Sequence, residues 1–264
     1  MPDIVITTAR KANPDIWRRA REWAQTLDAP VVPRLERSLS KLCREENARG
    51  VLVVTTEGEV YHEPATGVAY HFHPNLAALR IHNITSGGGD QMIEAMRLGP
   101  GDEVLDCTLG LGAEAIVCSH VVGGAGRVVG IEKVPIIAHL TIKGLKVGEF
   151  VSERFVRAMR RVQAHCADHR EYLPQCEAGS FDVVYFDPIF DEPVPKSQSM
   201  EPLRAVADPS PLSKEALEEA LRVARRCVVI KQRRGTRLWQ ELGVCELHSG
   251  GKSRVEYGVI DATR

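Results

Sequence analysis

Strand-like and helix-like segments alternate through residues 104–230 of this chain, and this alternation limits the fold more than any other feature of the sequence. Such alternation is typical of α/β proteins, in which helices cover both faces of a parallel sheet. Ligands of these sheets bind at the C-terminal ends of the strands. We expect strands at residues 104–107, 128–132, 162–166, 182–186 and 227–230, followed by two more near 244–248 and 256–260.

Residues 1–75 form a small α/β domain in this interpretation, and residues 76–264 form the main domain. In the small domain we expect helices at 15–27 and 38–47 and short strands at 4–8, 31–32, 51–55, 60–62 and 68–72. Residues 76–98 join the two domains and contain a glycine run at 87–89, followed by a helix through Met96. The clearest helix of the main domain is expected at 213–226, where glutamates come first and arginines last, as suits a helix dipole.

The composition indicates a soluble globular protein without a charge bias. The 264 residues include 34 Lys and Arg against 35 Asp and Glu, a net charge of -1. This balance excludes a protein coated with basic charge, but it allows a local basic patch that binds nucleic acid. No apolar run approaches the ~18 residues of a membrane helix, and we expect no signal peptide. Seven scattered cysteines without a Cys-x-x-Cys pair are typical of a reduced, cytoplasmic protein.

A strand that runs into a glycine-rich turn marks the first candidate ligand site. Residues 104–107 lead into Gly110 and Gly112, and a helix is expected from Ala113 onward. The glycines allow a sharp turn and let a ligand approach the backbone without meeting a Cβ atom. Glu132 ends the next strand, twenty residues after Gly112. A carboxylate at this position can accept hydrogen bonds from both hydroxyls of an adenosine ribose.

Two adenosine cofactors compete for this loop. Gly110, Gly112 and Ala115 satisfy the relaxed fingerprint of dinucleotide sites. Glu114, however, lies in the first turn of the expected helix, where its charge would repel a pyrophosphate. Asp106, at the end of the preceding strand, suits a cofactor that carries an ammonium group. These two acids favour S-adenosylmethionine over NAD.

Asp168 follows the third strand of the expected sheet. Its carboxylate can accept a hydrogen bond from the amino group of adenine, or it can cap the helix that begins near His169, and one turn can serve both purposes. Residues 165–169 also combine two histidines, a cysteine and an aspartate. Because a strand alternates its side chains between opposite faces, a metal site here is disfavoured.

The most informative motif is Asp187-Pro188-Ile189-Phe190, which follows the strand pattern at 181–186. The aspartate carboxylate and the proline carbonyl are two acceptors that can hold both protons of an exocyclic amine and aim its lone pair at a methyl group. Phe190 can stack on a flat heterocycle, a contact worth ~1–3 kcal/mol per base. The alternative is an ordinary turn after a strand, which the glycine loop and Glu132 in the matching strand order disfavour.

Together these motifs resemble those of Rossmann-like S-adenosylmethionine-dependent methyltransferases. The tetrapeptide is similar to the Asn/Asp-Pro-Pro-Tyr/Phe motif of enzymes that methylate amino groups of nucleobases. More narrowly, residues 75–235 resemble the family of the bacterial 16S ribosomal RNA guanine-N2 methyltransferase of the small subunit. The marks of that family here are the glycine run, Asp106-x-Thr108 before the glycine loop, and Val229-Ile230-Lys231. The resemblance implies a class I methyltransferase sheet and S-adenosylmethionine as the cofactor.

The resemblance also implies which residues form the site. The catalytic residues that it implies are Asp187, Pro188 and Phe190. The chain departs from the family's pattern where Ala113-Glu114 replaces a basic–acidic pair, Lys133 replaces an arginine and Asp168-His169 replaces a serine pair. The loop after Phe190, Asp191-Glu192-Pro193, is also less basic than that of the family. These departures bear on the substrate rather than on cofactor binding. The implied cofactor-binding residues are Asp106, Gly110, Gly112, Ala113, Glu114, Glu132, Lys133, Asp168, His169 and Asp187.

Basic residues after the fifth expected strand indicate the substrate class. Lys231, Arg233 and Arg234 follow the strand next to the one that carries Asp187, and we expect them to contact phosphates of RNA. A second basic stretch at 154–161 is equally compatible with a solvated helix face.

The leading function is methyl transfer to guanine N2 of ribosomal RNA, through proximity and orientation and with no need for a metal or a covalent nucleophile. The alternatives are a methyltransferase for a small molecule or a protein, and an RNA-binding protein that senses the cofactor without turnover. We expect no membrane partner, and the oligomeric state is left open.

Overall fold

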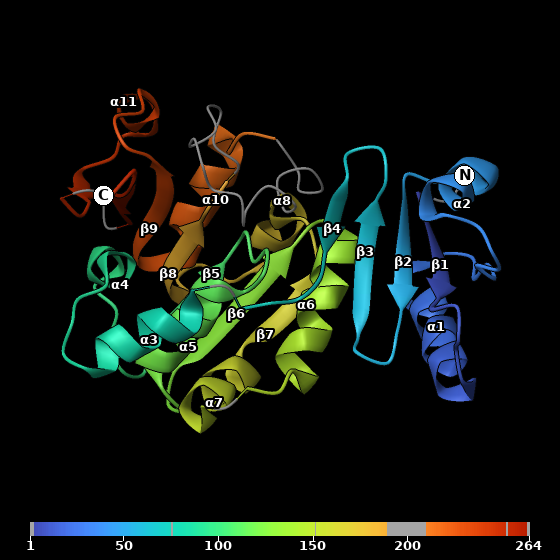
Figure 1. Cartoon of the computed structure of the whole chain (residues 1–264). Helices are drawn as coiled ribbons and strands as arrows, with labels where there is room; N and C mark the ends of the chain where they lie inside the picture. The colour runs from blue at the N-terminus through green and yellow to red at the C-terminus, as the bar shows by residue number, and fades with distance from the viewer. Residues whose placement is uncertain (1–2, 75, 151, 189–209, 252, 263–264) are drawn as a thin grey trace. The chain divides into compact units, whose positions relative to one another are not determined.

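The computed structural model describes residues 3–262 except positions 75, 151, 189–209 and 252 (Figure 1). Within this part of the chain, two compact units divide between Phe72 and His73, and each unit has its own sheet. None of the described helices is both long and apolar enough to cross a membrane.

The first unit, residues 3–72, is built on a four-stranded sheet with the strand order β1-β2-β3-β4. β1 and β2 are parallel, and the other neighbours are antiparallel. Val5 and Val51 of the sheet are buried with Leu42 of α2 in one core. The elements of this unit are β1 (Ile4–Thr8), α1 (Pro14–Leu27), α2 (Leu39–Glu46), β2 (Gly50–Val54), β3 (Glu59–Glu63) and β4 (Val68–Tyr70).

Side-chain caps fix the starts of both helices in the first unit. Asn13 accepts a hydrogen bond of 3.0 Å from the backbone N–H of Ile16 at the start of α1. Ser38 accepts one of 3.2 Å from Lys41 at the start of α2. Such caps satisfy backbone donors that the first helical turn leaves unpaired. The short strand expected at 31–32 is reduced to a single bridge with β1.

The second unit carries a seven-stranded sheet with the order β10-β11-β9-β8-β5-β6-β7 (Figure 1). Five neighbouring strands, β9, β8, β5, β6 and β7, all run parallel to one another. β11 runs antiparallel to both β9 and β10. This sheet confirms the expected Rossmann-like α/β fold. Its strands are β5 (Glu103–Asp106), β6 (Arg127–Glu132), β7 (Gln163–Cys166), β8 (Phe181–Phe186), β9 (Ala224–Arg233), β10 (Glu246–His248) and β11 (Val255–Asp261).

Helices of the second unit pack against this sheet. α5 lies against β5 and β6, α6 against β6 and β7, and α10 against β8 and β9. Leu217 of α10 shares a buried core with Val184 of β8 and Val228 of β9. The helices of this unit are α3 (Ala77–Thr85), α4 (Gln91–Met96), α5 (Ala113–Val122), α6 (Pro135–Val147), α7 (Glu153–Arg161), α8 (His169–Tyr172), the 3-10 turn η1 (Leu173–Gln175), α10 (Lys214–Val223) and α11 (Leu238–Leu242).

Helix α10 is shorter, and strand β9 longer, than the sequence pattern predicts. The helix ends at Val223, so Arg225 and Arg226 belong to the strand. Arg225 pairs with Asp182 at 2.9 Å, and Arg226 pairs with Asp102 at 2.7 Å. The expected assignment of these arginines to a helix terminus is therefore wrong, because ion pairs at the start of the sheet hold them.

The strand order places β5 between β6 and β8, and the chain changes direction across the sheet at this point. From β5 it continues outward through β6 and β7, and it then returns to the other side of β5 through β8 and β9. In open α/β sheets with such a change of direction, ligands bind at the C-terminal ends of the strands on either side of it. Asp106 and Asp187 stand at these two strand ends.

Candidate active site

The glycine loop after β5 is locked in a conformation that suits glycine. Gly110 and Gly112 have φ values of +50° and +76°, in the left-handed region where side chains are disfavoured. The hydroxyl of Thr141 on α6 donates a hydrogen bond of 2.7 Å to the carbonyl of Gly110. Ala113 begins α5 directly after Gly112, and it is buried. The loop is therefore held from α6, and both of its glycines are buried.

Glu132 ends β6 beside this loop. One carboxylate oxygen accepts a hydrogen bond of 3.0 Å from the N–H of Gly110, and the other accepts one of 2.9 Å from the N–H of Val134. The side chain is almost fully buried. The structure thus brings Glu132 and the glycine loop together, as the spacing predicts, and it orients the carboxylate from both sides.

Asp106 is the most deeply buried acid of the site. Its Oδ1 accepts a hydrogen bond of 3.0 Å from the N–H of Thr108, whereas its Oδ2 is buried with no hydrogen-bond partner among the described residues. Burial raises the pKa of Asp106 to about 8, and the nearby Glu114 and Asp187 add to the rise. A buried acceptor without a partner costs about 1–3 kcal/mol. An ammonium group of a bound cofactor would supply the missing partner, so the residue fits the expected ligand.

Asp187 follows β8 and is fastened to the glycine loop. Its backbone N–H donates a hydrogen bond of 2.6 Å to the hydroxyl of Thr108. Burial raises the pKa of Asp187 against the opposing effect of Lys231. Pro188 comes next and is half-buried, and Phe190 lies outside the described residues. Sequence reasoning placed Thr108 within a motif without a role, although a hydroxyl two residues after a strand-ending acid was the available signal.

Lys231 is the closest charged neighbour of Asp187. Its Nζ lies 2.6 Å from Asp187 Oδ2 and 3.2 Å from Glu114 Oε1, and its side chain is only 16% exposed. Because it is engaged by two carboxylates inside the protein, this position does not fit the expected contact with RNA phosphate. The pairing is a correction to the sequence interpretation of Lys231.

Glu114 is also held differently from the expectation. Besides Lys231, it contacts the guanidinium of Arg80 at 3.3 Å, and Arg80 in turn forms two hydrogen bonds, of 2.8 and 2.9 Å, with Asp90. Although burial opposes it, Lys231 and Arg80 lower the pKa of Glu114. The carboxylate is therefore ionised but neutralised, so the argument that its free charge repels a pyrophosphate fails. Sequence reasoning missed Arg80 because the helix α3 that carries it was not predicted.

The ends of β6 and β7 meet through Asp168. Its carboxylate accepts a hydrogen bond of 3.0 Å from the N–H of Arg170, which caps α8, and it lies 3.4 Å from Lys133 Nζ. The Arg170 guanidinium holds the pKa of Asp168 well below its usual range. His169 packs edge-on against Phe186, with ring centroids 5.5 Å apart. The capping interpretation of Asp168 is thus correct, and the residue stands at the predicted edge of the sheet.

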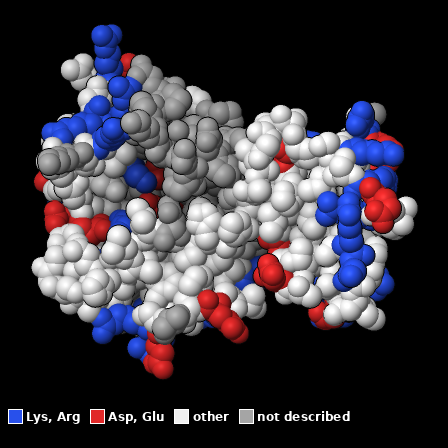
Figure 2. Space-filling model, in the orientation of Figure 1, with Lys and Arg blue, Asp and Glu red and all other residues white. Residues whose placement is uncertain are grey.

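Four exposed arginines lie at the C-terminal end of β9 and just beyond it. Arg233 is paired across the sheet with the residue after Arg254, and the N–H of Arg234 bonds the carbonyl of Arg254 at 2.9 Å. Figure 2 shows Lys and Arg side chains concentrated over this part of the second unit, where α11 lies in Figure 1. We call this surface the β9 patch, and its exposed members are Arg233, Arg234, Arg237 and Arg254.

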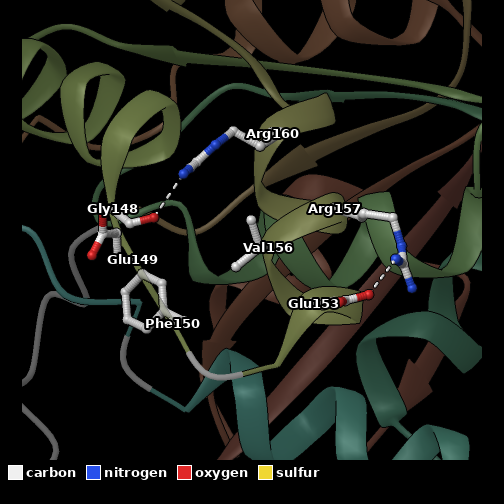
Figure 3. Close-up of a pocket in the computed structure, with 7 residues that line it drawn as sticks. All are labelled: Gly148, Glu149, Phe150, Glu153, Val156, Arg157 and Arg160. Carbon is white, nitrogen blue, oxygen red and sulfur yellow. Dashed lines mark hydrogen bonds and ion pairs between the residues drawn. The ribbon is translucent and has the colours of Figure 1, made fainter.

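A hollow between α6 and α7 has a volume of about 510 Å³ (Figure 3). Arg160 reaches the carbonyl of Gly148 at 2.7 Å, and Arg157 pairs with Glu153 at 3.1 Å. Because α7 leads directly into the start of β7, the hollow lies at the sheet edge opposite the candidate site. Arg160 serves here to satisfy the last carbonyls of α6.

Comparison with known proteins gives the family. A family model described as "Putative SAM-dependent methyltransferase" matches residues 38–255. The chain is 36% identical over 260 residues to the uncharacterized protein YpiP of Bacillus subtilis, which covers 98% of this chain and 100% of that protein. It is 28% identical over 224 residues to ribosomal RNA small subunit methyltransferase J of Halorhodospira halophila, covering 81% and 79% of the two chains.

A solved structure shows the same fold. The SAM-dependent methyltransferase NGO1261 of Neisseria gonorrhoeae superposes with a TM-score of 0.66 at 18% identity, covering 98% of this chain and 96% of that one. The family model spans more than three quarters of the sequence. The chain therefore belongs to this family of S-adenosylmethionine-dependent methyltransferases.

Proposed function

We propose that this methyltransferase modifies the exocyclic N2 amine of guanine in small-subunit ribosomal RNA. The observation that carries the proposal is the position of Asp187, a largely buried carboxylate fastened to the glycine loop and followed directly by Pro188. Two distant relatives are named ribosomal RNA small subunit methyltransferase J, one from Halorhodospira halophila and one from Aliivibrio fischeri, which supports RNA as the substrate class.

The C-terminal ends of the strands offer one polar group for each part of the cofactor. S-adenosylmethionine supplies a methyl group on a positively charged sulfur. In our proposal Asp106 accepts from the cofactor ammonium, Glu132 from the ribose hydroxyls and Asp168 from the adenine amino group. Gly110 and Gly112 let the cofactor lie against the backbone.

Asp187 and the carbonyl of Pro188 accept the two protons of the substrate amine and aim its lone pair at the methyl carbon. A carboxylate can accept about four hydrogen bonds, so the contact with Lys231 leaves capacity for the amine. The N–C bond forms as the C–S bond breaks, and the surplus amine proton passes to water. Phe190 stacks on the base. Orientation supplies most of the rate acceleration in this scheme.

The β9 patch supplies the contacts with RNA. Arg233 and Arg234 stand two and three residues beyond Lys231, whose amine touches Asp187, so the patch adjoins the side from which a substrate approaches. Arginine forks bind phosphate oxygens and fix the position of a nucleic acid without reading its sequence. Arg237 and Arg254 extend the same surface.

A transfer assay tests the proposal. The purified protein is incubated with methyl-labelled S-adenosylmethionine and ribosomal RNA from a strain that lacks this gene, and the RNA is digested to nucleosides. We expect label in N2-methylguanosine. Asp187→Ala should reduce transfer by about a hundredfold or more, because the acceptor that orients the amine is lost.

The control is binding of S-adenosylhomocysteine, measured by calorimetry, which Asp187→Ala should change far less than transfer. Label in another nucleoside would correct the target atom. Label in a protein or small-molecule fraction, with none in RNA, would overturn the RNA assignment. Tight cofactor binding without any transfer would favour a cofactor-sensing protein.

A further inference from the structure

The pairing of Lys231 with Asp187 is set by strand register rather than by chance contact. Phe186 of β8 pairs with Ile230 of β9, so the next residues, Asp187 and Lys231, lie side by side where β8 ends and β9 continues. On its other side β9 pairs with β11, which places Tyr257 opposite Lys231. The lysine is thus fixed by two neighbouring strands at the point where the candidate acceptor emerges.

A second layer of charge holds the lysine itself. Glu114 of α5 binds Lys231 at 3.2 Å, and Arg80 of α3 binds the same Glu114 oxygen at 3.3 Å. The side chains of these residues and of Asp187 are all between 16% and 22% exposed. In such surroundings the attraction between opposite charges is stronger than in water. Lys231 therefore has a single well-defined place beside Asp187.

We propose that Lys231 is a positioning residue of the methyl transfer, which fixes the orientation and the negative charge of Asp187 so that its second oxygen accepts the substrate amine. Glu114 and Arg80 act one step further away by holding Lys231. The inference rests on the proposed role of Asp187 in orienting the amine. It gives Lys231 a part in the chemistry and removes it from the RNA-binding surface.

The charges around Asp187 give the inference a signature in pH. Lys231 favours the ionised carboxylate, whereas Glu114 disfavours it. Removing Lys231 should raise the pKa of Asp187, because a close opposite charge favours the ionised carboxyl. Removing the charge of Glu114 should lower it. The titratable and charged groups that face Asp187 are Lys231, Glu114, Arg80, Asp106, Tyr185 and Tyr257.

The experiment compares kcat against pH for Lys231→Met and Glu114→Gln at saturating cofactor. Because the proposed role uses the ionised form of Asp187, the acidic limb of the profile should move to higher pH in Lys231→Met and to lower pH in Glu114→Gln. Lys231→Arg, which keeps the charge, should keep the limb near its original position. Lys146→Met removes an exposed lysine of α6 and should leave the profile unchanged.

A second measurement does not depend on turnover. Carbon-13 NMR of aspartate-labelled protein, assigned with Asp187→Asn, follows the titration of the Asp187 carboxyl in the same variants. If the protein does not methylate RNA, the proposed function fails, but the opposite shifts of the carboxyl pKa in the two variants would still establish the positioning of Asp187 by Lys231.

Opposite displacements in Lys231→Met and Glu114→Gln support the inference. It is overturned if both variants lose activity with no movement of the acidic limb, or if the carboxyl titration is the same in Lys231→Met as in the original protein. If Lys231→Met does not fold, the test rests on Lys231→Arg and Glu114→Gln. An acidic limb that lies at the same pH in Glu114→Gln as in the original protein then contradicts the inference.

Discussion

The backbone N–H of Asp187 donates a hydrogen bond of 2.6 Å to the hydroxyl of Thr108. The same hydroxyl lies 3.4 Å from Asp106 Oδ1, to which it can donate its own proton. One threonine thus connects the acid proposed for the cofactor with the acid proposed for the substrate. Because β5 and β8 are neighbouring strands, this link sets the spacing of the two ends of the reacting pair.

Replacement of Thr108 by valine tests the link. Thr108→Val keeps the shape of the side chain but removes the acceptor for the Asp187 N–H, which should cost about 1–3 kcal/mol of stability. We expect kcat to fall at least about tenfold, since the amine acceptor is misplaced, and the affinity for S-adenosylhomocysteine to change less. Thr26→Val, on the exposed face of α1, is the matched control. Unaltered kcat in Thr108→Val would contradict the link.

Glu132→Gln tests the ribose assignment with little change in volume. The amide can no longer accept with two charged oxygens, so the N–H of either Gly110 or Val134 loses a strong partner. Charged hydrogen bonds contribute about 1.5–3 kcal/mol, so the affinity for S-adenosylhomocysteine should fall roughly tenfold to a hundredfold. Calorimetry provides the measurement, with NAD as the competing ligand. Unchanged affinity for S-adenosylhomocysteine would remove Glu132 from the cofactor site.

Asp106 predicts a pH dependence of stability. Its carboxyl has a pKa of about 8 in the folded protein, against about 3.9 in an unfolded chain. Between these values the folded state binds more protons than the unfolded state at this group, so the contribution of Asp106 to stability is greatest at low pH and falls as the pH rises toward 8. Thermal unfolding without cofactor should show this decline, and Asp106→Asn should reduce it. An equal decline in Asp106→Asn would contradict the assignment.

Cofactor binding should show the opposite trend with pH. An ammonium beside Asp106 favours the ionised carboxyl, so binding releases a proton and tightens as the pH rises toward 8. Calorimetry of S-adenosylhomocysteine binding in buffers of different ionisation enthalpy measures the proton release. Asp106→Asn should bind the cofactor more weakly and release no proton at this site. Binding that weakens from pH 6 to pH 8 would count against an ammonium beside Asp106.

The β9 patch predicts salt-dependent binding of RNA. Each phosphate contact with a single strand contributes a slope of about -0.7 to the log–log plot of affinity against salt, so replacing Arg233, Arg234 and Arg254 with alanine should flatten the slope by about two units. Affinity for the cofactor should stay nearly unchanged. Arg154→Ala with Arg157→Ala, on α7 at the opposite edge of the sheet, is the control. If the slope is the same in the triple variant and in the original protein, the patch is a solvated surface that makes no phosphate contacts.

The sequence predicts best what is decided locally. The buried strands, the glycine loop and the acid that ends β6 all follow from runs of a few residues whose backbone preferences agree with the fold. The capping residues Asn13 and Ser38 also lie next to the helices that they start, although we did not predict them as caps. Short stretches of sequence are therefore enough to place these elements.

Long-range pairing accounts for the rest. Glu114 and Lys231 are 117 positions apart, and neither residue's own neighbourhood indicates the other. For this reason the sequence interpretation left Glu114 as a free charge and Lys231 as a phosphate ligand. Arg254 was missed for the same cause, because only the antiparallel pairing of β11 with β9 brings it to Arg233.

Charges of alternating sign run from Asp187 through Lys231, Glu114 and Arg80 to Asp90, and each comes from a different segment of the chain. Losing any one of them leaves an opposite charge stranded in a site largely closed to water, which is usually strongly destabilising. A substitution at only one of these positions is therefore selected against. Among descendants of one ancestor, the five should be inherited as a block or exchanged together, so their joint variation would trace the lineage of this site more faithfully than any one motif.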